Sequence, residues 1–472
     1  MRRPLAAAAL ATLLATHAAT ASAHPGELPA TPEIGLAAEL SAGRIAEDTF
    51  GSLDLKVGAQ LSVPALLCDP SLNTHDCQTL LRAALHAPLR LRVVDQPPED
   101  ASLLRRQDWD EPADALRLLR HLEYGLPGDT LRLRVGELGP LTLGHGSLVQ
   151  DYFSVLTPDL PRVAAHASLD TPGWAASATV TDLTRPSFFF ARAQVRPLHW
   201  LLPGSFLARL TLGASLVSDL GAPTTLAPGS AASPTSSPAV TDQAATTLLG
   251  ADIEYALTGS EDLDLRLYSD LGALPGEGLN VHAGLIGSAT ISGALTARAQ
   301  LEYAWLSGGL TPRYVGPLYE VDRFQLSGWG LGLPAPRRRV AASIDLDGVQ
   351  SSRADLSLNV LPIGLLARAA YTRISQASDA DSFTAALTLS PPPLPALQLA
   401  AFYHHQSFEG LDRAISWRDE TLLSAEARLD LAPWLYLSGR LDRQFSLDDS
   451  GLFSPITTWS AGLGTSWTLS MP

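Results

Sequence analysis

The chain has 472 residues, of which 46% are hydrophobic but only 7% aromatic, and its formal net charge is −15. An acidic balance of this size excludes nucleic acid as a partner, because phosphates select basic surfaces. The 37 glycines and 35 prolines favour many short strands joined by turns over long helices.

The N-terminus has the three parts of an export signal. Met1-Arg2-Arg3 is basic, an apolar stretch runs from Leu5 to Ala15, and Ala21-Ser22-Ala23 forms a small-residue cleavage site. We therefore predict a cleaved signal peptide at 1–23 and an N-terminal periplasmic segment at 24–48. The alternative is a membrane anchor, which needs about 20 apolar residues, whereas this stretch is shorter and interrupted by polar residues.

Beyond the signal, no run of about 18 apolar residues occurs, so the sequence predicts no membrane-spanning helix. Apolar residues instead alternate with polar or small ones over segments long enough to cross a bilayer as β-strands. In 49–63, Leu53 and Leu55 share one face, and Asp54 and Lys56 share the other. The alternation recurs at 87–95, 161–170, 248–258, 294–306, 337–347, 353–361, 382–390, 421–431, 434–446 and 457–470.

The connections between these segments alternate in length. Short ones, such as 259–261 and 431–434, alternate with longer ones, such as 220–244 and 307–317. Outer-membrane barrels pair short periplasmic turns with longer outward loops, and a closed barrel satisfies every strand backbone group in lipid. We therefore predict an all-β fold over 49–472, a transmembrane antiparallel up-and-down β-barrel of 16–20 strands. A soluble sandwich would also alternate, but with fewer and shorter strands.

Cys68 and Cys77 are the only cysteines, and they flank a polar segment. In an exported protein this spacing predicts a disulfide that closes a surface loop. Zinc would need further thiols or a histidine pair, which His75 alone does not supply. We therefore expect no metal site and no cofactor.

One segment breaks the strand pattern. In 110–124, Pro112 lies near the start, and leucines recur at helical spacing up to Leu122, before Gly125. This pattern predicts a short amphipathic helix inserted in the barrel. Its leucines would pack against the barrel rim or another loop, or the helix would form a plug within the lumen.

His145 and Ser147 stand two residues apart, so on a strand both would face one side, where a base could activate a nucleophile. Gly144 and Gly146 favour a bulge or tight bend instead, with His145 in a structural hydrogen bond. The adjacent pair His404-His405 would point to opposite faces of a strand and cannot share a metal, so we predict that it lies at a solvated strand end. We expect neither pattern to be catalytic.

Charged residues fall opposite the apolar face in many of the predicted strands. A dry core would not tolerate so many charges, whereas a water-containing lumen would, and rings of charge there impose ion selectivity. The alternative is a salt-bridge network that stiffens or occludes the barrel. We predict that the lumen is lined by Arg192, Asp252, Glu254, Asp264, Arg266, Arg298, Glu302, Asp345, Asp355, Glu426, Arg428, Arg440 and Asp442.

Aromatic residues cluster near the predicted strand ends, which is typical of the girdles at the two membrane interfaces. The final strand places Trp459, Leu463 and Trp467 on one face. It looks like the C-terminal signal that the outer-membrane assembly machinery recognises, although the chain ends in Met471-Pro472. We expect this machinery and outer-membrane lipid to be partners.

Three stretches resemble known proteins: DWDEPADALRLLRHLEYG (108–125), LRLRVGELGPLTLGHGSLVQDYF (131–153) and SFFFARAQVRPL (187–198). They resemble an uncharacterised proteobacterial outer-membrane β-barrel family with a DEPxD-helix-YG block, an LGHG(T/S) segment and an ARxxxRPL strand. The resemblance covers the N-terminal third. It implies the fold and a location in the cell outer membrane, but no activity.

These observations predict a porin-like channel or transporter for small solutes, because a barrel of this size encloses water. One alternative is a non-conducting structural or surface-interaction barrel that displays the 220–244 and 307–317 loops. A barrel hydrolase built on His145 and Ser147 is the third hypothesis. The sequence favours the channel, with a small-solute ligand and no enzyme activity.

Overall fold

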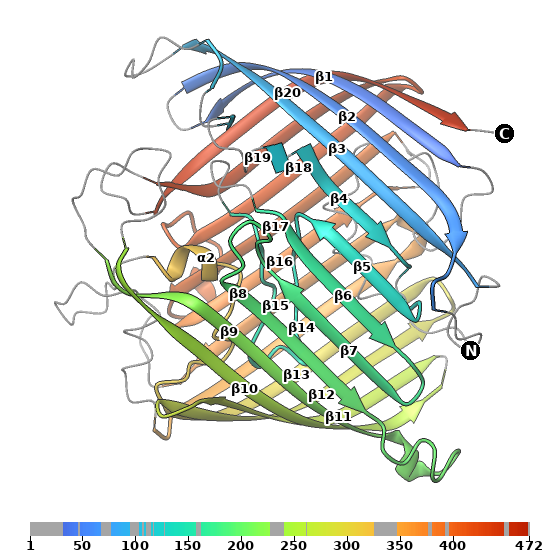
Figure 1. The fold of residues 1–472 in the computed structure, drawn as a ribbon, viewed down its shortest axis with the longest axis vertical. Helices are drawn as coiled ribbons and strands as arrows, with labels where there is room; N and C mark the ends of the chain where they lie inside the picture. The colour runs from blue at the N-terminus through green and yellow to red at the C-terminus, as the bar shows by residue number, and fades with distance from the viewer. Residues whose placement is uncertain are drawn as a thin grey trace.

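Twenty antiparallel strands form one closed sheet in the computed structural model (Figure 1). Consecutive strands pair along the chain, and β1 also pairs with β20, which closes the barrel. The structure describes residues 32–45, 48–67, 77–94, 103–105, 108–109, 115–116, 118–126, 128–156, 162–226, 240–260, 262–324, 347–375, 380–391, 396–447 and 453–470.

The strands are β1 (Glu33–Ile45), β2 (Asp48–Pro64), β3 (Gln78–Val94), β4 (Leu119–Tyr124), β5 (Leu131–Gly136), β6 (Ala164–Asp170), β7 (Trp174–Val180), β8 (Phe188–Val195), β9 (Leu210–Leu226), β10 (Val240–Gly259), β11 (Leu263–Leu274), β12 (Gly278–Ile291), β13 (Leu295–Gly308), β14 (Gln350–Val360), β15 (Leu365–Ile374), β16 (Asp381–Leu389), β17 (Leu397–Phe408), β18 (Thr421–Ala432), β19 (Leu435–Leu447) and β20 (Phe453–Ser470). The named helical elements are short: η4 (Phe206–Arg209), α2 (Tyr319–Asp322), η5 (Leu361–Ile363) and η6 (Leu411–Arg413). Among the described residues, none of the helices is long and apolar enough to cross a membrane.

The barrel closes through β1, which lies inside the predicted periplasmic segment 24–48. That prediction is wrong for Glu33–Ile45, because Glu33 pairs with Gln60 on β2 and with Ser470 on β20. Pairing on both sides gives the backbone groups of β1 the partners that lipid cannot supply. Small alanine, glycine and serine side chains fill much of β1, which makes its alternation weak in the sequence.

The 20 strands agree with the predicted 16–20, but the helix predicted at 110–124 is wrong in its second half. Leu119–Tyr124 is β4, which pairs with β3 on one side and β5 on the other. A helix here would leave the backbone edges of β3 and β5 unpaired, so the strand is favoured despite the leucine spacing. Residues 110–114 and 117 lie outside the described part of the chain.

Side chains alternate between the outside and the lumen along the strands. On β10, for example, Leu249 and Ile253 are exposed on the outer face, whereas Asp252 and Glu254 point inward and bind partners there. Exposed leucines and tryptophans continue around the other strands. The outer surface is therefore an apolar band of the kind that faces lipid.

The two longest connections lie at one end of the barrel, and most of the short turns lie at the other. We call one the turn end, where β1 starts, β20 ends and short turns such as 171–173 and 292–294 join strands. The loop end carries the long connections 137–163 and 309–349. Because barrels place short turns in the periplasm, we assign the turn end to the periplasmic side.

Several predictions fall partly or wholly outside the described residues. These include the signal peptide 1–23, the strand at 337–347 except for its last residue, and Cys68. Cys77 is disulfide-bonded, but its pairing with Cys68 stays a prediction. The predicted loop 220–244 is too long, because β9 extends to Leu226 and β10 begins at Val240.

Candidate functional site

Two segments from the loop end fold into the lumen and meet there. The first inner segment is 137–156 and the second is 309–324, which includes α2 (Figure 1). Val149 and Val315 form a parallel bridge between them. The Gln150 N–H donates to the Val315 carbonyl at 2.9 Å, and the Val315 N–H donates to the Leu148 carbonyl at 3.0 Å. Together the two inner segments form what we call the partition.

Apolar contacts anchor the partition to opposite walls of the barrel. On one side, Val149 and Tyr152 share a buried cluster with Phe188 and Phe190 of β8. On the other side, Leu156 and Leu318 share a second cluster; its wall residues are Ala386, Phe402, Leu422, Phe445 and Phe453. Aromatic side chains that point into the lumen are thus covered, since the hydrophobic effect favours their burial. The partition spans the lumen from β8 to β20.

A glycine-flanked turn forms the tip of the first inner segment. Leu141 and Tyr152 exchange backbone hydrogen bonds of 2.8 Å, which makes the segment a hairpin. Gly144 and Gly146 have φ angles of 61° and 93°, in a backbone region that residues with a Cβ rarely adopt. The two glycines therefore allow the turn that carries His145 to the barrel wall.

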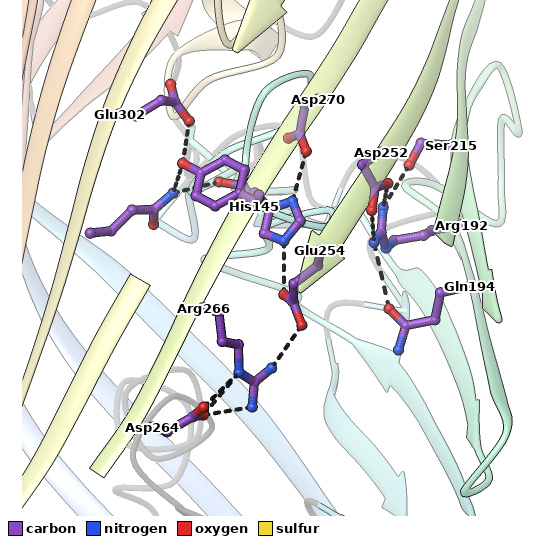
Figure 2. Close-up of polar contacts among 12 residues, drawn as sticks. His145, Arg192, Gln194, Ser215, Asp252, Glu254, Asp264, Arg266, Asp270 and Glu302 are labelled. Carbon is purple, nitrogen blue, oxygen red and sulfur yellow. Dashed lines mark hydrogen bonds and ion pairs between the residues drawn. The ribbon is translucent and has the colours of Figure 1, made fainter. Parts of the chain in front are cut away.

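His145 inserts its ring between two carboxylates of the wall (Figure 2). Nδ1 lies 2.8 Å from Asp270 on β11, and Nε2 lies 3.0 Å from Glu254 on β10. The ring stacks on Tyr268 with a centroid distance of 4.1 Å. Burial opposes protonation, but hydrogen bonds to Asp270 and Glu254 outweigh it and raise the pKa of His145 to about 9. The imidazole is therefore a cation at neutral pH.

The wall at this point holds an acidic pair. Asp252 and Asp270 are directly opposite in the β10–β11 register, where like charges destabilise a sheet. Arg192 of β8 neutralises Asp252 through two hydrogen bonds, one of 2.8 Å from Nη2, and His145 neutralises Asp270 (Figure 2). Ligand atoms of His145, Asp252 and Asp270 lie within 4.8 Å of one another. This set does not fit a metal, because each member is already paired with a charge of the chain.

This geometry argues against the hydrolase hypothesis, because His145 cannot act as the general base for Ser147. Both ring nitrogens of His145 are engaged by carboxylates, so the ring has no free lone pair to take a proton from Ser147. The structural hydrogen bonding expected for His145 is confirmed. His404 is buried beside Thr384 of the neighbouring strand, 2.9 Å from its hydroxyl, and lies in a strand interior rather than at a solvated end.

Two polar cavities lie on either side of the partition. The larger, about 690 Å³, is on the turn-end side and has Arg266, Arg298 and Asp355 in its lining. The smaller, about 140 Å³, is on the loop-end side; its lining includes Arg313, Asp322, Arg353, His404 and Gln406. Gln150 and Asp151 line both cavities. These two residues of the first inner segment therefore stand between them.

A chain of ion pairs joins Asp151 to the wall. Arg368 of β15 donates to Asp151 at 2.7 Å and 3.0 Å and to Asp355 of β14 at 2.6 Å. Arg353 of β14 donates to the same Asp355 at 2.7 Å. Arg298 lines the larger cavity without an ion pair to any described residue. Its guanidinium is thus available to a solute.

The predicted lumen residues fall into three groups. One group lines the larger cavity: Arg192, Glu254, Asp264, Arg266, Arg298 and Asp355. Asp252 is not in that lining but is paired with Arg192, which is. Another is held in pairs within the barrel: Glu302 with Arg313, Arg428 with Asp430, and Arg440 with Asp442, which lies one strand from Glu426. Asp345 lies outside the described residues.

Sequence reasoning missed Gln150, Asp151 and Arg368. Arg368 stands between Ala367 and Ala369, and their alternation could have placed it in the lumen. Gln150 and Asp151 belong to a connection with no strand or helix period, so no sequence signal directs them inward.

No protein-family model matches the chain, and no curated protein matches it. Among solved structures, OccK11 (OpdR) of Pseudomonas aeruginosa is 11% identical, with a TM-score of 0.34 over 93% of this chain and 96% of that one. OccK8 (OprE) of the same organism is 11% identical, with a TM-score of 0.36 over 94% and 98%. OpdK of that organism, solved with vanillate, is 10% identical, with a TM-score of 0.34 over 94% and 100%.

Proposed function

We propose that the protein is an outer-membrane, porin-like channel that passes small hydrophilic solutes. The observation that carries this proposal is the pair of polar cavities that meet at Gln150 and Asp151. An apolar outer band and a closed strand ladder support a place in a bilayer. Charged residues line the cavities on both sides of Gln150 and Asp151, as is expected of a water-filled path.

In this proposal a solute crosses the partition beside the Asp151–Arg368 pair. Carboxylate and guanidinium groups that face the cavities replace part of the hydration shell of a polar solute as it passes. Arg298 adds a positive charge that no described carboxylate neutralises by direct contact. We infer that this charge contributes to ion preference on the turn-end side.

The alternative of a non-conducting barrel has one observation in its favour. The partition packs against both walls and is tied to them by ion pairs, which is the arrangement of a closed lumen. The surface-display version is weakened, because Leu310 and Val315 of the predicted 307–317 loop are fully buried in the lumen.

Planar-bilayer recordings of the refolded protein test the proposal. Discrete conductance steps, with swelling of liposomes in small sugars or amino acids, are the expected result. Folding is checked by the heat-dependent mobility of the barrel in detergent gels. A folded wild type that neither conducts nor swells liposomes would support the closed barrel and refute the channel.

A further inference from the structure

The connection between β8 and β9 (196–209) exposes large apolar side chains at the turn end. Leu201 is 74% exposed, Phe206 65% and Trp200 59%. Leu202 and Leu207 are also exposed. Exposure of such a cluster to water is unfavourable, because removing each Å² of apolar surface from water stabilises the protein by about 25 cal/mol. The connection therefore presents an apolar surface that contact with a second apolar environment would stabilise.

This connection folds against the outer face of the barrel, not across its mouth. The Tyr255 hydroxyl of β10 donates to the Phe206 carbonyl at 3.3 Å, and Arg209 Nη1 donates to the Leu257 carbonyl at 2.9 Å. Tyr255 and Leu257 belong to the outward row of β10, opposite the lumen-facing Glu254. In Figure 1 the connection projects beyond the ends of β8 and β9.

A second contact fixes Trp200 beside the neighbouring turn. Its indole lies so close to Gly173, in the β6–β7 turn, that a Cβ at Gly173 would come within 1.9 Å of a ring carbon. Any larger residue at Gly173 would displace the ring. The tryptophan is thus held in place while more than half of its surface stays exposed.

The backbone of the connection is hydrogen-bonded within itself. The His199 N–H donates to the Arg196 carbonyl and the Leu202 N–H to the Leu198 carbonyl, both at 3.0 Å. The Ser205 hydroxyl accepts from the N–H of Ala208 at 3.3 Å and caps η4. A segment that enters a membrane interface needs such internal hydrogen bonds for its backbone N–H and C=O groups.

We propose that 196–209 is an interfacial anchor that inserts Trp200, Leu201 and Phe206 into the periplasmic leaflet, with phospholipid as its partner. Lipid is the occupant that fits, because the connection is hydrogen-bonded to Leu257 of β10, and both Leu257 and Leu212 of β9 are exposed on the lipid-facing band. Tryptophan and a flanking arginine are the residues that settle at the headgroup level. The inference rests on the proposed residence of the barrel in a bilayer, but not on conduction.

The test uses the full-length barrel, one copy per lipid nanodisc, in phosphatidylethanolamine and phosphatidylglycerol. Leu201→Cys carries an environment-sensitive nitrobenzoxadiazole label, and the lipids carry a spin label near the top of the acyl chain. Asp262→Cys is the matched control, since Asp262 is an exposed polar residue in the β10–β11 turn at the same end. The native disulfide keeps Cys77 unreactive.

The expected result is that spin-labelled lipid quenches the Leu201 label at least about threefold more than the Asp262 label. Equal quenching at both positions would overturn the proposal. A shielded Leu201 label that spin-labelled lipid does not quench would also overturn it and point to a protein partner or a second copy. A smaller quenched fraction of tryptophan fluorescence in Trp200→Phe than in wild type, with brominated lipid, gives a second readout that needs no cysteine; the exposed tryptophans of the strands, such as Trp305 and Trp467, stay quenched in both proteins. Conductance is measured in parallel, so that failure of the anchor proposal and failure of the channel proposal can be told apart.

Discussion

Arg368 of the barrel wall holds Asp151 of the first inner segment through two hydrogen bonds of 2.7 Å and 3.0 Å. The two residues are 217 positions apart in the chain. Bidentate pairs between arginine and carboxylate fix orientation as well as distance. The pair therefore sets how far the partition stands from β15.

Arg368→Met should enlarge the path through the partition. The substitution leaves Asp151 without its guanidinium partner, so the first inner segment loses its tie to β15. Breaking a buried charge pair costs about 3–5 kcal/mol, which is enough to free the segment from its docked position, so we expect a single-channel conductance clearly above that of wild type. Arg428→Met is the control, because the described contacts of Arg428 are with Asp430, Ser466 and Tyr436, all on barrel strands. Equal conductance of both variants and wild type would contradict the prediction.

Arg298→Glu should shift ion preference towards cations. A unit charge near a passing ion changes its energy by about 1 kcal/mol in water, or about fivefold in relative permeability. The reversal potential in a salt gradient measures this ratio. Arg298→Lys keeps the charge and should stay close to wild type; an unchanged reversal potential in Arg298→Glu would remove Arg298 from the selectivity site.

The His145 contact should weaken at alkaline pH. The pKa of His145 in the folded protein is about 9, above its ordinary 6.5, so the stability that it adds is complete below about 6.5 and lost as pH rises through 9. The shift corresponds to about 3 kcal/mol. Urea unfolding of wild type and His145→Gln at pH 6 and pH 10 measures it. The stability gap between the two proteins should narrow at pH 10, and a constant gap would show that His145 is not charged.

Gly144→Ala should strain the turn that presents His145. A side chain at its φ of 61° costs about 1–2 kcal/mol. The added Cβ would also lie 2.7 Å from Arg192 Nη1 and push that guanidinium from Asp252. Gly439→Ala, in β19 with open space around it, is the matched control and should leave the urea midpoint unchanged. Similar midpoints for both variants would argue against this account of the turn.

Glu320→Gln should loosen both inner segments at once. Glu320 of α2 is buried and binds the Tyr152 hydroxyl and Arg162. Removing one member of a buried charge cluster costs about 3–5 kcal/mol. Protease added to the folded barrel should cut within 137–156 or 309–324 faster than in wild type. Glu409→Gln, at an exposed loop position, should show wild-type cleavage.

Period-two alternation made much of the fold predictable from the sequence. A strand that separates lipid from water has to alternate, so Asp252, Glu254 and Asp355 could be placed without knowing their partners. The same reasoning failed in β1, where alanine, glycine and serine make up much of the strand and weaken its alternation. It also failed in β4, whose leucines fit a helical spacing as well as a strand.

The partition was beyond sequence reasoning for a different reason. Its apolar residues, such as Leu148 and Val149, pack against a wall that exists only after distant strands have closed. A connection without periodicity carries no information about whether it points outward or into the lumen. Phe188 and Phe190 were a usable signal, because inward aromatic side chains in a wet lumen require a cover.

The opposed carboxylates of Asp252 and Asp270 bear on the order in which the protein assembles. The β10–β11 hairpin brings them together as soon as it forms, but His145, which compensates Asp270, arrives from 125 residues away. Until the tip of the first inner segment docks and brings His145 to Asp270, this wall of the lumen carries excess negative charge. Docking of the first inner segment therefore completes the charge balance of this wall of the lumen.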